Sequence, residues 1–467
     1  MNGKGEEMEK KKTKNLRNYS ILEYIKFIIP SLLGIILFIM PISENGEITI
    51  PIAVLSNKLQ GFFAEYMQNI LLVLVCFSFV GAILFKMIKL CTKDCKMIQH
   101  KLVKSLFDVS ILWLVFRGIA AVFTILICTG STFEMVVSTN TGGLVFYDLL
   151  PILFTIFLLA GLFLPLLLNF GLLEFAGTLL IKVMKPVFGL PGRSAVDAIA
   201  SWLGDGTIGV LLTSKQYEDG FYTEKEACII GTSFSLVSIT FSLVVINTVG
   251  LGNMFVPFYL TVTFACIIAA ILLPKIPPLS RKKNLLITGK APENVDEIPK
   301  DQTGFSYGVE CALKKVKDVK VIRSIFVEGV HNVLDMWISV IPIVMTIGTI
   351  ALIIAEYTPI FSYLGMPFVP LLELLGIPEA AAASQTLFAG FADMLLPSVM
   401  VADTVSSELT RFVVAAVSVS QLIYLSEVGA LILASKIPVK LGELFIIFIE
   451  RTLLTLPIIA IIAHMIF

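Results

Sequence analysis

The chain has 467 residues, of which 57% are hydrophobic and 15% charged, and its mean hydropathy is +0.91. Soluble domains carry about 25% charged residues, so this composition excludes a soluble globular protein and indicates an integral membrane protein. The 35 basic and 35 acidic residues cancel, so the net charge does not point to a nucleic-acid partner, and we expect none.

The N-terminal third of the sequence is organised as a polar tail followed by apolar runs. Residues 1–20 are rich in lysine and are interpreted as a cytoplasmic tail. Residues 21–170 are interpreted as N-terminal scaffold helices, because each of their four apolar runs is long enough to cross a bilayer. These runs cover about 24–42, 67–88, 107–129 and 149–169.

An apolar run with an acid at its centre follows at Ala195 to Thr213. It is about long enough to cross the bilayer once, yet it contains Gly204-Asp205-Gly206. Glycines on both sides of an acid break a helix readily, and a carboxylate at membrane depth is tolerated only where it lines a cavity or is buried in protein. We interpret the run as a re-entrant hairpin; a single kinked transmembrane helix is the alternative.

The rest of the chain divides into two repeats joined by a polar loop. The first repeat, 171–274, contains the hairpin and spans at about 227–248 and 255–274. The loop, 275–322, is interpreted as cytoplasmic. The second repeat, 323–467, comprises a long helix at 324–355, an irregular proline-rich segment at 358–378, a broken apolar run at 380–400, and spans at 410–433 and 442–465.

Basic residues are distributed unevenly among the loops. Loop 89–106 has five and loop 275–323 has eleven, whereas loops 130–148, 249–254 and 356–378 have none. Lysine and arginine mark the cytoplasmic side, and the basic and bare loops alternate only if 195–213 and 380–400 return to the side they entered from. This rule predicts about nine crossings, a cytoplasmic N-terminus and an external C-terminus in the cytoplasmic (inner) membrane.

The two repeats share a sequence pattern. Gly189-Leu190-Pro191 recurs as Gly376-Ile377-Pro378, each followed by an alanine-rich start and a Gly/Asp cluster. Thr223-Glu224 and Ser407-Glu408 then precede a serine-dotted span. Because the charge rule gives the two hairpins opposite orientations, the pattern predicts an inverted repeat, which is typical of secondary transporters.

At these residues the sequence resembles the nucleoside-recognition Gate-domain membrane proteins of the YjiH type. The matching stretches include GLPGRSAVDAIASWLGDGTIGVLLTSKQY, AGFADMLLPSV and RFVVAAVSVSQLIYLSEVGALILAS, within residues 185–465. Gate domains are similar in turn to the transport core of concentrative nucleoside transporters. The resemblance implies an all-α polytopic membrane protein with two re-entrant hairpins in a transport core, and a nucleoside or related compound as solute.

Several polar residues of the hairpins and the spans that follow them are candidate substrate-binding residues. Asp205 and Asp393 lie at corresponding helix breaks and can bind a solute or cap the half-helices. Gln421 and Glu427 lie within a predicted span, where Ser420, Tyr424 and Glu427 share one helix face. Ser235 and Ser238 can contact solute or pack against another helix. The predicted substrate-binding set is Asp205, Ser201, Asp393, Ser235, Ser238, Gln421, Glu427 and Asn332.

A polar stripe on the long helix is the candidate ion path. Glu328, His331, Asn332 and Asp335 are spaced i, i+3, i+4 and i+7, which places them on one helix face. Histidine titrates near neutrality, so the stripe suits a cation or a proton, and contact with water and headgroups is the alternative. We expect Glu328, His331, Asp335 and Glu427 to couple the ion. Arg117 and the pair Glu450-Arg451 also lie in apolar runs, where we expect structural ion pairing or snorkelling.

Together these features predict a secondary-active transporter of a small polar solute, driven by a sodium or proton gradient. An amino-acid or small-peptide transporter and a non-transporting scaffold remain alternatives. The sequence has no Walker, HExxH or supported GxSxG motif, so we expect no enzyme activity, no metal site and no cofactor other than Na⁺ or H⁺ as coupling ion. The expected partners are the solute, the lipid bilayer, and either further copies of the chain or a second Gate-domain membrane protein.

Overall fold

The computed structural model describes residues 19–40, 42–44, 47–91, 100–203, 206–234, 239–292, 302–317, 319–321 and 323–467. Three candidate site residues, Asp205, Ser235 and Ser238, lie outside this part of the chain. Within it, the only strands are β1 (Ile42–Glu44) and β2 (Glu47–Thr49), which pair antiparallel. The rest of the regular structure is helical, which confirms the predicted all-α membrane fold.

Seven helices of the described residues are long and apolar enough to cross a membrane. Only 28% of the apolar window of each of the first three is buried, against 72% for the sixth, so the first three present apolar side chains outward and the sixth is central. The seven are α2 (Ile21–Phe38), α4 (Met67–Cys91), α7 (Ile111–Cys128), α9 (Leu150–Leu168) with a π-helical start at Leu144, α15 (Phe255–Leu272), the long helix Arg323–Tyr357 that contains α17 (Gly329–Asp335) and α18 (Ile341–Tyr357), and α26 (Leu441–Ile466).

Two of the nine expected crossings contain two separate α-helices in the described part of the chain. The first contains α13 (Glu224–Ile229), which continues in π-helical form through Ile230–Phe234, and α14 (Ile239–Thr248); residues 235–238 between them lie outside the described residues. The other stops at the end of α24 (Glu408–Gln421) and resumes as α25 (Val428–Ala434). Leu422 has a φ of +60°, which an L-residue does not adopt in a right-handed helix, so the prediction of one continuous helix over 410–433 is wrong.

The broken run at 195–213 is a helical hairpin. Its arms are α11 (Ser194–Leu203) and α12 (Gly206–Glu218), and they pack side by side: a Cβ on Gly209 would lie 2.7 Å from the Cβ of Ser201. The alternative of a single kinked transmembrane helix is therefore wrong. An arm of 13 residues is about 20 Å long, less than the hydrocarbon thickness of about 30 Å.

A second helical hairpin occupies the broken apolar run at 380–400. It consists of α21 (Ala380–Leu387), α22 (Ala389–Ala392) and α23 (Leu396–Thr404), and α21 packs against α23. The glycines that precede the two hairpins, Gly189 and Gly376, both have a φ of +68°. This left-handed conformation ends the preceding helical turn and favours glycine.

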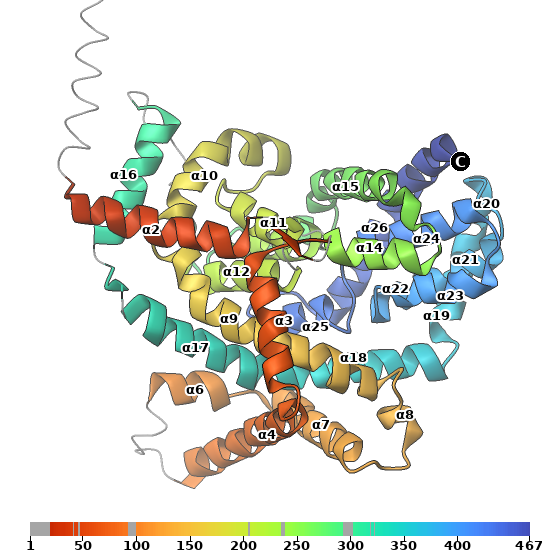
Figure 1. Ribbon diagram of the computed structural model, residues 1–467, viewed down its shortest axis with the longest axis horizontal. Coiled ribbons are helices and arrows are strands. Elements are labelled where there is room, and N and C mark those ends of the chain that lie inside the picture. Colours follow the sequence, from red (N-terminus) through yellow and green to blue (C-terminus); the bar gives the residue numbers. More distant parts are fainter. Residues whose placement is uncertain are drawn as a thin grey trace, which may run out of the picture.

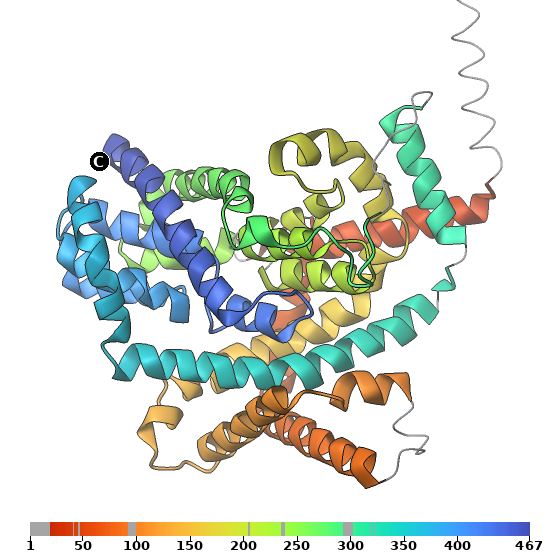
Figure 2. The same cartoon turned by 180° about the vertical axis from the view of Figure 1, so that it is seen from behind.

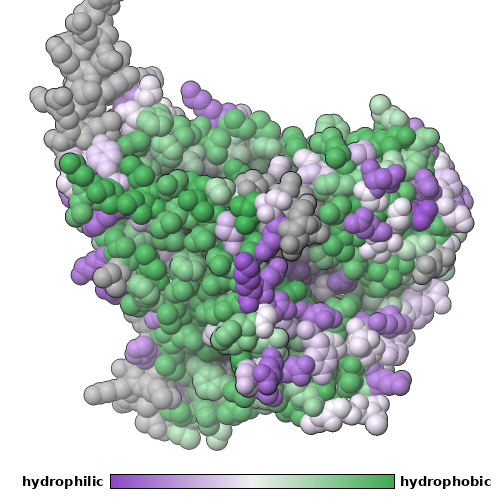
Figure 3. Space-filling model, in the orientation of Figure 1, coloured by the Kyte–Doolittle hydropathy of each residue, from purple (hydrophilic) through white to green (hydrophobic). Residues whose placement is uncertain are grey.

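The long helix lies between two layers of the molecule (Figure 2). The smaller layer contains α4, α7, α6 (Lys101–Phe107) and α8 (Glu134–Val137), whereas the larger contains the hairpins, α14, α24, α25, α15 and α26 (Figure 1). α3 (Pro51–Phe63) packs on α9 and links the two. Apolar side chains cover much of the face shown in Figure 3, as expected for a surface in contact with lipid.

Two connecting segments are more ordered than the sequence predicts. The 275–322 loop contains α16 (Gly304–Lys317), which packs closely on α10 (Leu172–Val183): a Cβ on Gly308 would lie 3.2 Å from Phe175. The segment 358–378 is not irregular but forms α19 (Ile360–Gly365) and α20 (Val369–Leu374). Pro367 and Pro370 occupy first helical turns, where the missing N–H has no helical partner to lose.

Candidate functional site

The tip of the second hairpin binds the interrupted part of the α24–α25 helix. The backbone N–H groups of Leu425 and Ser426 donate to the carbonyl oxygens of Phe391 and Ala392, each at 2.8 Å. Asp393 completes the contact: one carboxylate oxygen accepts from Ser426 Oγ at 2.8 Å and the other from the Leu395 N–H at 2.9 Å. These bonds supply partners that the broken helix no longer provides.

Gln421, the last residue of α24, connects this helix to the same hairpin. Its Nε2 donates to the carbonyl oxygen of Leu387 at 3.0 Å and to Thr452 Oγ1 at 2.8 Å. Its Oε1 is buried without a hydrogen-bond partner and lies against Gly390, where an added Cβ would be 2.3 Å away. Gln421 thus lies at the predicted site but contacts protein on both sides, which suits a residue that positions the hairpin.

Glu427 and Tyr424 do not share a helix face with Ser420, because Leu422 to Glu427 are not helical. The predicted face is therefore wrong. Instead, Tyr424 donates its hydroxyl to Glu427 Oε2 at 3.3 Å within the non-helical segment. The start of α12 lies beside the start of α25, since a Cβ on Gly206 would be 3.5 Å from Val428. The structure therefore brings the first hairpin next to Glu427.

Arg451 of α26 lies between the end of α24 and the π-helical turn after α13. Its side chain is fully buried, its Nε donates to the carbonyl oxygen of Ser420 at 2.9 Å, and Nη1 donates to those of Thr232 and Ser233 at 3.3 and 3.2 Å. The carbonyl of Ser420 lies at the end of α24, where the helix dipole is negative, and those of Thr232 and Ser233 belong to the π-helical turn after α13. Neither Arg451 nor the buried Arg117 has a carboxylate within ion-pair distance in the described part of the chain, so the expectation of ion pairing or snorkelling is wrong for both.

The first hairpin encloses a buried carboxylate that the sequence analysis did not select. Asp197 of α11 is 1% exposed and accepts three hydrogen bonds: from Thr213 Oγ1 at 3.0 Å, Gln216 Nε2 at 2.6 Å and Tyr222 Oη at 3.0 Å. Two of these donors are on α12, so the carboxylate fastens the two arms together. Ser201 lies in the same interface, packed against Gly209. In the sequence, the available signal was an acid in an apolar run. The side chains that donate to it follow 16, 19 and 25 residues later.

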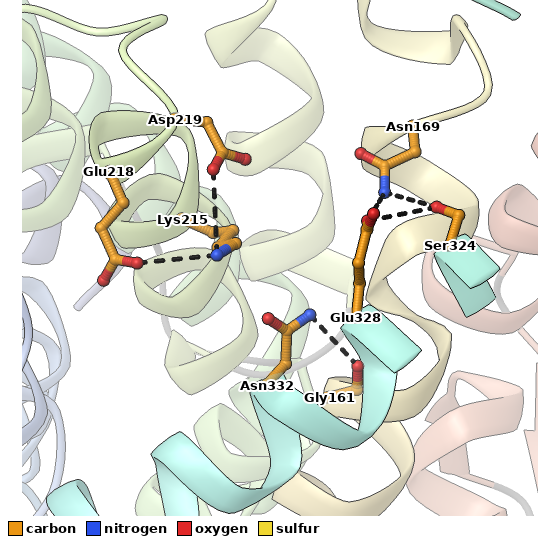
Figure 4. Close-up of polar contacts among 8 residues, drawn as sticks. All are labelled: Gly161, Asn169, Lys215, Glu218, Asp219, Ser324, Glu328 and Asn332. Carbon is orange, nitrogen blue, oxygen red and sulfur yellow. Dashed lines mark hydrogen bonds and ion pairs between the residues drawn. The ribbon is translucent and has the colours of Figure 1, made fainter. Parts of the chain in front are cut away.

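The polar stripe of the long helix is divided between two environments (Figure 4). Glu328 and His331 are exposed, and Glu328 accepts from Asn169 Nδ2 at 2.7 Å. Asn332 is buried and donates to the carbonyl oxygen of Gly161 at 3.4 Å, and Asp335 accepts from Ser339 Oγ at 3.3 Å. Only the last two face the first hairpin.

Asn332 and Asp335 line a narrow cleft between the long helix, α12 and the segment after α25. Lys215, Glu218 and Lys436 line it as well, and Lys215 lies 3.6 Å from Glu218 and 3.8 Å from Asp219. Figure 4 shows Lys215 directed between these two carboxylates, across from Asn332. The cleft volume is about 70 Å³, enough for about two water molecules at roughly 30 Å³ each, so it admits water or an ion rather than an organic solute.

The fold and these contacts define a multi-pass membrane protein of the transporter type, in which two helical hairpins meet the interrupted α24–α25 helix at a buried polar junction. The family profile described as Gate, nucleoside recognition, matches residues 150–252, from the start of α9 through the first hairpin, α13 and α14. An uncharacterized protein of Alkalihalophilus pseudofirmus is 49% identical over 443 residues, covering 95% of each chain. The chain belongs to the Gate-domain family, as the sequence resemblance predicted. No solved structure matches the chain.

Proposed function

We propose that the protein is a secondary-active transporter of a small polar solute, nucleoside-like in chemistry, coupled to a sodium or proton gradient. The observation that carries the proposal is a buried junction: the tip of the second hairpin bonds the break after α24, the start of α12 lies beside the start of α25, and Arg451 joins the end of α24 to the turn after α13. Broken helices with polar side chains at membrane depth are the usual site of solute and ion binding in transporters built from inverted repeats.

The two repeats support this proposal by their matching local structure. In each, a glycine with a φ of +68° precedes the hairpin, and a Thr or Ser N-cap with an acid in the first turn begins the next helix. The N-caps are Thr223 and Ser407. These helices, α13 and α24, are followed by α14 and α25, and a long span closes each repeat, α15 in the first and α26 in the second.

The arrangement of the lysine-rich segments supports the proposed orientation. α6 and α16 lie at one end of the molecule, and α8 and α20 lie at the other (Figures 1 and 2). If the lysine-rich end is cytoplasmic, as the charge rule requires, the N-terminus is inside and the C-terminus outside. The cleft at Asp335 then lies on the cytoplasmic side of the junction and provides a route for the coupling ion, and Glu328 and His331 lie about two turns and one turn before Asp335 on the same helix.

The solute class is tested by ligand-induced stabilisation of the purified protein. Nucleosides, nucleobases, amino acids and dipeptides are screened by thermal unfolding, with Na⁺ or with choline and at two pH values. A ligand that binds only the native state at 100 times its Kd stabilises it by about 2.7 kcal/mol. We expect a nucleoside to raise the Tm. A rise with amino acids or dipeptides alone identifies the alternative transporter class, and no rise with any compound favours the scaffold.

A further inference from the structure

A basic cleft lies away from the junction, between the segment after α15 and the start of α26. Its volume is about 800 Å³, and three parts of the chain line it: the start of α13, residues 277–283 and residues 438–446. Four of the lining residues are basic: Arg281, Lys282, Lys283 and Lys440. None of them belongs to the residues proposed above to bind the solute or the coupling ion.

The walls of the cleft are fixed by buried contacts. The ammonium of Lys282, 10% exposed, donates to the carbonyl oxygen of Pro438 at 2.6 Å and to Glu443 Oε2 at 2.8 Å. On the opposite side, the N–H groups of Glu224 and Lys225 donate to the carbonyl oxygens of Leu285 and Lys283 at 2.8 and 3.0 Å. The cleft is therefore built by the fold and is not a gap between loose side chains.

The charge that remains in the cleft is positive. Glu443 is neutralised by Lys282 and also accepts from the N–H of Lys440 at 2.8 Å. Arg281, Lys283 and Lys440 are exposed and form no ion pair within the described ranges, which leaves Glu224 as the one other acid in the lining. The N-terminus of the 26-residue helix α26 adds a partial positive charge at the same place.

We propose that this cleft binds a phosphate group, carried either by the headgroup of an anionic lipid or by a soluble phosphate ester. A guanidinium fork with two ammonium groups and a helix N-terminus matches the charge and the oxygen acceptors of phosphate. The exposed side chains of Leu441 and Ile446 stand at the same end of α26, and basic clefts beside membrane helices on the cytoplasmic side are common sites for anionic headgroups.

Binding at this cleft acts on the helix that holds the junction. Glu443 precedes Arg451 by eight residues, about 12 Å along α26. A ligand that fixes the start of α26 therefore restrains the helix whose guanidinium joins the end of α24 to the turn after α13. The binding itself does not depend on the proposed function, whereas its effect on transport rests on it.

The test uses the full-length protein in a neutral detergent and measures Tm against increasing phosphatidylglycerol, phosphatidylcholine, or pyrophosphate. One variant combines Arg281→Gln, Lys283→Gln and Lys440→Gln. The matched control combines Lys314→Gln, Lys317→Gln and Lys320→Gln, which removes three exposed charges from the neighbourhood of α16. Because all six side chains are exposed, we expect both variants to keep the wild-type Tm without ligand.

We expect a saturable rise in Tm for the wild type and the control, and an apparent affinity at least tenfold weaker for the cleft variant. A response to phosphatidylglycerol alone identifies the lipid headgroup, and a response to pyrophosphate identifies a soluble ester. No saturable response to either probe, or an equal loss in the cleft variant and the control, would overturn the proposal. Failure of solute transport would leave these binding results intact.

Discussion

Arg451 shows how a charge can be buried in this fold without a carboxylate. Removing a guanidinium from water costs several kcal/mol, and here the carbonyl oxygens of Ser420, Thr232 and Ser233 compensate it. The bond to Ser420 also satisfies a carbonyl in the last turn of α24, where no further helical N–H is available. The Arg451 side chain thus connects α26 to both α24 and the turn after α13.

We predict that Arg451→Met lowers stability by about 3 kcal/mol or more, because it leaves buried carbonyl oxygens without donors. Arg451→Lys should lie between Met and wild type, since one ammonium cannot reach Ser420 and Thr232 together as the guanidinium does. Thermal unfolding in detergent measures both. Arg323→Met, which removes the same group from an exposed position on the long helix, should be near neutral. Equal Tm values for the two Met variants would contradict the role of Arg451.

Gly390 provides a test of the contact between the second hairpin and α24. A Cβ there would lie 2.3 Å from Gln421 Oε1, so we expect Gly390→Ala to displace Gln421 and cost about 1–3 kcal/mol. Gly61→Ala is the matched control, because nothing lies within 4 Å of its Cβ and alanine favours helix α3 by up to about 1 kcal/mol. The Tm should fall in the first variant and hold or rise in the second. If the Tm falls in neither variant, the second hairpin does not depend on the close approach of Gly390 to Gln421.

At the scale of elements, residue type and spacing predicted those helix starts and ends that depend on a few neighbouring residues. The glycines before the hairpins, the caps at Thr223 and Ser407, and the break near Asp393 could all be read from residue type and spacing. The end of α24 could not, because nothing in the residue type of Leu422 announces a φ of +60°. The face proposed for Tyr424 and Glu427 failed for this reason.

Contacts between distant elements were the other limit of the sequence. The donors of Asp197 and the carbonyl partners of Arg451 come from segments up to 25 and 219 residues away, so their roles appear only in the fold. The segment that forms α16 was interpreted as a loop because its many lysines gave it a polar composition. The small residues that pack on α10 were not recognised as a helix face. Asn332 and Asp335 were placed correctly on one helix, but their cleft is completed by α12 and Lys436.

At the scale of the whole molecule, the long helix separates an outer layer of α4 and α7 from the layer that contains both hairpins (Figure 2). Arg117 of α7 crosses this boundary: its Nη2 lies 3.4 Å from Ser339 Oγ, and Ser339 in turn donates to Asp335. The outer layer is therefore connected to the cleft on the proposed ion route. This arrangement suits a fixed layer against which the hairpin layer moves, as alternating access requires.

The most direct test of the proposed function is uptake of a labelled nucleoside into proteoliposomes under an imposed sodium or proton gradient, for the wild type, Asp393→Asn and Glu408→Gln. Asparagine can keep the contacts to Ser426 and Leu395 while removing the charge, and Glu408 offers the same change at an exposed position on α24. We predict gradient-driven uptake by the wild type and Glu408→Gln, and a loss of at least tenfold in Asp393→Asn at an unchanged Tm. No uptake of nucleosides under either gradient, or equal uptake by all three proteins, would contradict the account.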